Sequence, residues 1–136
     1  MGALLLLTVP PKGLGAAVLA ALWHETGHLI ALRRMKIPVR RVEFGAFGAG
    51  IETAPMEPRQ ELLAAAAGPA AGLLLALGWQ VIPRCAVCAF LQSVWNLLPV
   101  FPMDGGRMMV QLSRILYAKR QIPVAKNGIS EYNDSD

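Results

Sequence analysis

Three long apolar stretches constrain the fold of this chain more than any other feature of its sequence. They cover residues 13–32, 62–82 and 85–101. The first two have the roughly 20 residues that a helix needs to span a bilayer, and the shorter third can be tolerated if the bilayer thins locally. With 54% hydrophobic and 16% charged residues, the 136-residue chain is too apolar for an ordinary soluble domain. The sequence therefore predicts an all-α membrane protein with about three transmembrane helices.

The basic residues predict the orientation of these helices, because short loops rich in Lys and Arg stay in the cytoplasm. Of the 13 Lys and Arg residues, all but Lys12 and Arg84 lie between the first two stretches or after the third. We therefore expect a multi-pass protein of the cell membrane whose middle loop and C-terminus are cytoplasmic. The net charge of +4 is expected to attract the lipid bilayer, and no stacking aromatic residues accompany the basic ones, so no nucleic-acid partner is predicted.

Two terminal segments lie outside the apolar stretches. Residues 2–9 are apolar, but about 12 Å of helix cannot cross the bilayer alone. No basic segment precedes them, which argues against a cleaved signal peptide and leaves a helix remnant or a re-entrant piece. The other segment, residues 121–136, is polar and is predicted to be a disordered tail that follows a membrane-embedded core of residues 1–120.

Both histidines of the chain fall in one five-residue string, HETGH, which runs from His24 to His28 near the end of the first apolar stretch. Residues four apart lie one turn apart on the same helix face, so both imidazoles can reach one zinc ion. Glu25 beside them can take a proton from zinc-bound water and later pass it to a leaving amine. The alternative is ordinary packing of these side chains in a helix bundle, which lipid would make costly for a Glu between two His.

A third metal ligand has to come from elsewhere in the chain. The longer HExxHxxGxxH pattern fails because Ala31 and Arg34 stand where it needs Gly and His. Two of the three aspartates lie in the polar tail, which leaves Asp104 as the candidate carboxylate ligand. Prolines interrupt the helix just before it, and Gly105 after it lets another backbone approach closely. The alternative for this segment is a simple helix-ending turn.

Taken together, the two motifs resemble the site-2 protease family of membrane metalloproteases, which includes the sporulation proteases that release a pro-sigma factor. The resemblance covers about residues 13–118, where HETGH, a hairpin-like insert, AAAAGP and NLLPVFPMDGGR follow in the family's order. It implies that His24, His28 and Asp104 bind one zinc ion per chain. It also implies that Glu25 is the catalytic base and that Asn96 assists the substrate or the transition state.

The function implied by the resemblance is zinc-dependent, intramembrane cleavage of a membrane protein substrate, with the active site near the cytoplasmic face and a membrane regulatory partner. The chain departs from the family in two respects: Gly72 stands where family helices often carry Asn, and the further spans and regulatory domain of many members are missing. The alternative is a catalytically silent or truncated membrane scaffold. The intact set of ligands and base argues against it.

The segments between the motifs carry weaker signals. Residues 38–54 place β-branched and aromatic residues around glycines, which predicts a small β-hairpin on the cytoplasmic side. Its edge could receive an extended substrate as an added strand, and the alternative is a plain connecting loop. Gly68 and Gly72 fall in GxxxG register, which favours helix packing over a substrate role. Cys85 and Cys88 are expected to be ordinary buried thiols.

Overall fold

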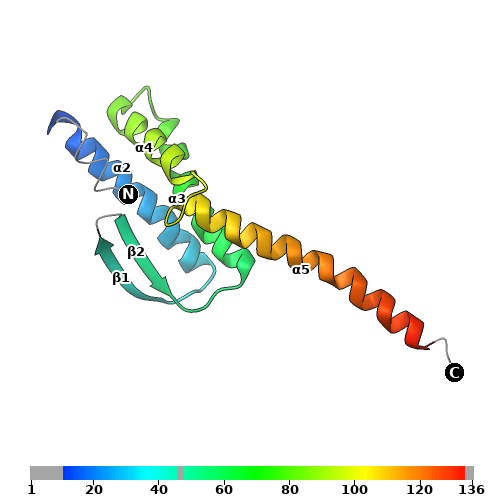
Figure 1. Cartoon of the computed structure of the whole chain (residues 1–136). Helices are drawn as coiled ribbons and strands as arrows, with labels where there is room; N and C mark the ends of the chain where they lie inside the picture. Colours follow the sequence, from blue (N-terminus) through cyan, green and yellow to red (C-terminus); the bar gives the residue numbers. More distant parts are fainter. Residues whose placement is uncertain (1–10, 46–47, 134–136) are drawn as a thin grey trace.

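The computed structural model describes residues 11–45 and 48–133, and the side chains of residues 13–42 and 51–120 within them (Figure 1). The elements follow one another as α2 (Pro11–Arg34), β1 (Val39–Gly45), β2 (Gly48–Thr53), α3 (Pro58–Ala76), α4 (Pro83–Asn96) and α5 (Asp104–Asn133). Helices α2, α3 and α4 pack against one another, and α5 packs on α3 before it extends away from the bundle (Figure 1). The predicted re-entrant or remnant helix at residues 2–9 lies outside the described residues.

Local hydrogen bonds fix the ends of the helices that carry the site. Helix α2 ends in a Schellman turn, in which Lys36 takes a left-handed conformation with φ of 57° and the N–H of Ile37 donates to the carbonyl of Leu32 at 3.0 Å. Helix α3 begins after Glu57, whose N–H donates to the side-chain oxygen of Gln60 at 3.1 Å. These caps satisfy backbone groups that the helices themselves leave open.

Small residues bring the three bundle helices close together. A Cβ added to Gly27 on α2 would lie 2.6 Å from the carbonyl oxygen of Ala67, so α2 and α3 touch backbone to backbone there. One turn earlier, the indole N–H of Trp23 donates to the carbonyl of Ala71 at 2.9 Å. A Cβ on Gly72 would overlap the hydroxyl oxygen of Ser93 on α4. The predicted packing role is therefore confirmed for Gly72.

The predicted β-hairpin is confirmed by an antiparallel pair of strands. Val42 of β1 lies opposite Ile51 of β2, and the pairing is irregular between Val39 and Arg41. Within the described residues, each of the two strands pairs only with the other. The predicted glycine-rich turn includes residues 46 and 47, which lie outside the described residues.

The predicted transmembrane helices are wrong. In the described part of the chain, no helix combines the length and the apolarity that crossing a bilayer requires. Helix α2 carries His24, Glu25 and His28 within its apolar run, and the apolar part of α3 begins only after Glu61. That apolar part, residues 62–76, amounts to roughly 22 Å of helix, and the 14 residues of α4 to roughly 21 Å, against a bilayer core of about 30 Å.

The correction extends to the predictions that rested on these spans. The expected all-α membrane fold is replaced by four helices and a small antiparallel sheet among the described residues, and the expected multi-pass location in the cell membrane is contradicted by the same finding. Helix α5 runs through Asn133. The division into a core of residues 1–120 and a tail of residues 121–136 stays a prediction.

Candidate metal centre

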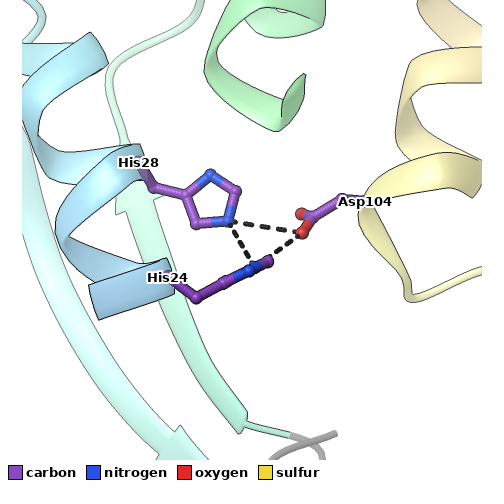
Figure 2. A group of neighbouring side chains, drawn as sticks. All are labelled: His24, His28 and Asp104. Atoms are coloured by element: carbon purple, nitrogen blue, oxygen red, sulfur yellow. Dashed lines mark hydrogen bonds and ion pairs between the residues drawn. The ribbon is translucent and has the colours of Figure 1, made fainter. Parts of the chain in front are cut away.

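The three predicted metal ligands meet at one point in the folded chain. His24 and His28 stand one turn apart on α2, and Asp104 opens α5, 80 positions after His24. Figure 2 shows the two imidazole rings and the carboxylate turned toward one another. The Nε2 atoms of the two histidines are 3.2 Å apart, and Oδ2 of Asp104 lies 3.1 Å from Nε2 of His24 and 3.3 Å from Nε2 of His28.

These distances fit a tetrahedral metal ion. With zinc–ligand bonds of about 2.0 to 2.1 Å, neighbouring ligand atoms of a tetrahedron lie about 3.3 Å apart. The observed separations of 3.1 to 3.3 Å between His24, His28 and Asp104 correspond to the three edges of one such face. Two imidazole nitrogens and one carboxylate oxygen are also a donor set that zinc accepts. The residues present therefore fit a zinc ion.

The protonation of His28 follows from its second hydrogen bond. Its Nδ1 lies 2.7 Å from the carbonyl oxygen of Ala64 on α3, and because a carbonyl only accepts, Nδ1 carries the hydrogen. In the neutral imidazole, Nε2 then presents a lone pair to the centre. Histidines that ligate metals are commonly oriented in this way by a carbonyl or a carboxylate. His24 differs, because its buried Nδ1 has no hydrogen-bond partner among the described residues.

The electrostatics of the site favour an ionised carboxylate. Burial alone would raise the pKa of Asp104, but the hydrogen bonds to His24 and His28, together with their charge, hold that pKa well below its ordinary value of 3.8. Burial would lower the pKa of His28, and its contact with Asp104 outweighs burial, so this pKa lies above its ordinary 6.5. His24 is only 2% exposed. A divalent cation would stabilise a buried anion that lies between two nitrogen bases.

Glu25 lies beside this centre on α2. Burial raises its pKa above the ordinary 4.5, although the nearby charges of His28 and His24 act in the opposite direction. A carboxyl whose pKa is raised is a stronger base, which favours the acceptance of a proton from water. Its predicted role as catalytic base stays a prediction, and its surroundings suit that role.

The two predicted supporting residues flank Asp104 and His24. Asn96, the last residue of α4, is buried, and its amide nitrogen lies 3.3 Å from Nε2 of His24. A Cβ on Gly105 would overlap the carbonyl of Leu97, so this glycine lets the start of α5 rest on the preceding loop. Gly105 thus permits the close approach of α5 to the loop directly beside Asp104. Any contact of Asn96 or Gly105 with a substrate stays a prediction.

Gly68 belongs to the site, although the sequence indicates only a packing role for it. A Cβ there would overlap Nε2 of His28 and would lie 2.5 Å from its Cε1 and 2.7 Å from Nε2 of His24. The two imidazoles can therefore lie against α3 only because residue 68 has no side chain. Nothing in the sequence separates Gly68 from Gly72, since both belong to the same GxxxG pattern and only the fold places one at the imidazoles and the other at Ser93.

Comparison with known proteins gives one match at a coarse level. No family model matches the chain. A protein of Synechocystis sp. that is named as a candidate zinc metalloprotease is 31% identical over 102 residues, which cover 63% of this chain and 27% of that protein. The chain therefore spans about a quarter of the length of this relative. The similarity supports a zinc metalloprotease in the broad sense.

Proposed function

We propose that this chain carries the zinc centre of a metalloendopeptidase with a ligand set of the site-2 protease type, in which an HExxH helix is completed by an aspartate from a later helix. The observation that carries the proposal is the meeting of His24, His28 and Asp104 at 3.1 to 3.3 Å from positions 80 residues apart in the chain. The similarity to a protein named as a candidate zinc metalloprotease supports the same conclusion.

The side chains around the centre suit peptide hydrolysis. Zinc held by the three ligands would polarise the carbonyl of a peptide bond and lower the pKa of a coordinated water to about 7. Glu25 accepts the proton that the attacking water loses and delivers it to the nitrogen of the leaving amine as the C–N bond breaks. Asn96 lies beside His24 and can donate an amide hydrogen to the oxygen on which negative charge develops.

Gly68 lets α3 approach the two histidines closely. A Cβ at residue 68 would overlap Nε2 of His28 and would lie 2.7 Å from Nε2 of His24. A side chain at this position would therefore displace the ligand atoms that the proposed zinc ion requires.

A protein substrate in extended form is the partner we propose. The hairpin offers strand edges that no other described strand occupies, and an extended peptide can pair with such an edge through its backbone. This pairing is independent of the metal ligands. A proline in β2, at Ile51, should therefore slow peptide hydrolysis while leaving zinc bound, and unchanged hydrolysis would remove the hairpin from the proposal.

The proposal is tested by hydrolysis assays on the full chain loaded with zinc, using a library of unstructured fluorogenic peptides. Glu25→Gln should bind zinc as the wild type does and lose roughly 100- to 10,000-fold in rate, because the amide cannot accept the proton. Arg114→Gln, which changes an exposed charged side chain on α5, is the control and should retain the rate. Wild-type rates in Glu25→Gln would refute the mechanism, and zinc-loaded wild type without any hydrolysis would favour the silent scaffold.

A further inference from the structure

A second polar cluster joins α3 to α5, away from the metal ligands. The Nε2 of Gln111 on α5 donates to Oε2 of Glu61 on α3 at 2.8 Å. A terminal guanidinium nitrogen of Arg107, also on α5, lies 3.5 Å from the other oxygen, Oε1, of Glu61. Gln111 is only 4% exposed, and the two charged side chains are partly shielded from solvent. Each carboxylate oxygen of Glu61 thus has its own partner on the facing helix.

On α3, Glu61 belongs to the helix face that supports the histidines. Ala64 follows it by three residues and Gly68 by seven, spacings that place all three along one side of a helix. The carbonyl of Ala64 holds Nδ1 of His28, and Gly68 borders the imidazoles. The helix that orients the HExxH side chains is therefore the one that Glu61 ties to α5.

On α5, the partners of Glu61 follow Asp104 by one and two helical turns. Helix α5 packs on α3 and makes few contacts with α2, although the carboxylate of Asp104 has to reach the histidines of α2. The first turn of α5 contains Gly105 and Gly106, which supply no side-chain anchors of their own. The position of Asp104 relative to the histidines therefore depends on the contact of α5 with the preceding loop at Gly105 and on how α5 is seated on α3.

We propose that Glu61, Arg107 and Gln111 form a clamp that positions Asp104 for metal binding, an inference that rests on the proposed zinc site. No hydrogen bond or ion pair of the described residues joins any of these three side chains to the ligand atoms, so they are positioning residues that act through α3 and α5. A hydrogen bond to a charged acceptor is stronger than one between neutral groups, and the burial of Gln111 limits competition from water.

The test uses two measurements on the full chain. Competition with a chromophoric chelator gives the zinc affinity, and the absorption spectrum of the Co²⁺-loaded protein reports how the ligands are arranged around the metal. Glu61→Ala should weaken zinc binding by roughly 10- to 100-fold, as loss of a residue that orients metal ligands does. It should also change the cobalt spectrum, which a loss of global stability alone would not do. Gln111→Leu should have a smaller effect of the same kind, because Arg107 still holds Glu61.

Two further variants keep the inference falsifiable. Glu61→Gln retains the size of the side chain and an acceptor for Gln111 but loses the charge, so it should fold and should show a partial loss of affinity. Arg114→Ala, which removes an exposed charge on α5, is the matched control and should bind as the wild type does. Wild-type affinity and an unchanged cobalt spectrum in both Glu61 variants would overturn the clamp alone. A wild-type chain that binds neither metal would overturn the proposed function instead.

Discussion

Replacing Gly68 with alanine should remove metal binding from a chain that still folds. The new Cβ would overlap Nε2 of His28 and would lie 2.7 Å from Nε2 of His24, closer than carbon and nitrogen atoms approach. The backbone of α3 is fixed by its helix, so the imidazole of His28 has to rotate away. That rotation breaks its hydrogen bond to Ala64 and removes one ligand atom from the centre.

The effect of Gly68→Ala on the stability of the metal-free fold should be moderate. Alanine in a helix interior is favoured over glycine by about 0.5 to 1 kcal/mol. Loss of the hydrogen bond between His28 and Ala64 costs about 0.5 to 1.5 kcal/mol. Overlap with the buried imidazole adds about 1 to 3 kcal/mol of destabilisation, so the free energy of unfolding in denaturant should fall by about 1 to 3 kcal/mol. Zinc affinity should fall by more than the roughly 10- to 100-fold that follows from loss of a supporting hydrogen bond alone.

The matched control is Gly15→Ala on α2. A Cβ at Gly15 has no atom within 4 Å, so this variant should gain the stability of a better helix former and should bind zinc as the wild type does. Chelator competition and urea unfolding measure the two quantities on the same samples. Wild-type zinc affinity in Gly68→Ala would show that the close approach of α3 to the imidazoles at this glycine does not serve the metal centre.

Two further predictions concern packing and pH. Gly72→Ala should lower the free energy of unfolding by about 1 to 3 kcal/mol without changing zinc affinity, because its Cβ meets Ser93 and not the imidazoles. The double variant Gly72→Ala, Ser93→Ala should recover most of this loss of stability. A double variant no more stable than Gly72→Ala would refute the reasoning. In the metal-free protein, the raised pKa of His28 contributes stability that is present below pH 6.5 and is lost as pH rises through the raised value. The lowered pKa of Asp104 contributes stability that is present above pH 3.8 and is lost in acid. Melting temperatures without metal should therefore be highest between about pH 4 and 6.5, whereas a steady rise toward pH 8 would contradict the ion pair.

The sequence predicts two kinds of site residue well: residues linked by a short spacing, and residues of a type that is rare in the chain. His24 and His28 share a helix face because of their four-residue interval, and the structure places them so. Asp104 stands out because the other two aspartates lie in the polar tail, and the structure places it beside both imidazoles. The hairpin was predicted from β-branched residues around glycines, a local signal that pairing of the two strands confirms.

The transmembrane helices were predicted wrongly because an apolar run in a sequence does not reveal where a helix begins or ends. The run at residues 62–82 continues past Ala76, the last residue of α3, and stops before α4 begins at Pro83. Much of its apolar character comes from alanines such as Ala64 and Ala65, which are buried against neighbouring helices. Such small residues raise the hydrophobicity of a sequence, and they also allow helices to pack closely.

Contacts between distant segments could not be predicted at all. Glu61 and Gln111 lie 50 positions apart, and no pattern links them. Gly68 and Gly72 are equivalent in the sequence, since their different neighbours, the imidazoles and Ser93, come from other helices. These residues acquire their roles only when α2, α4 and α5 are placed around α3.

The zinc content of the full chain after equilibrium dialysis tests the proposed centre most directly. Wild type should retain one zinc ion per chain, while His24→Ala and Asp104→Ala, which each remove one of the three converging ligand atoms, should lose it at the same free zinc concentration. Arg114→Ala, with its exposed charge removed, should retain the metal. Zinc bound equally by wild type and by both ligand variants, or a folded wild type without zinc, would contradict a centre built from these residues.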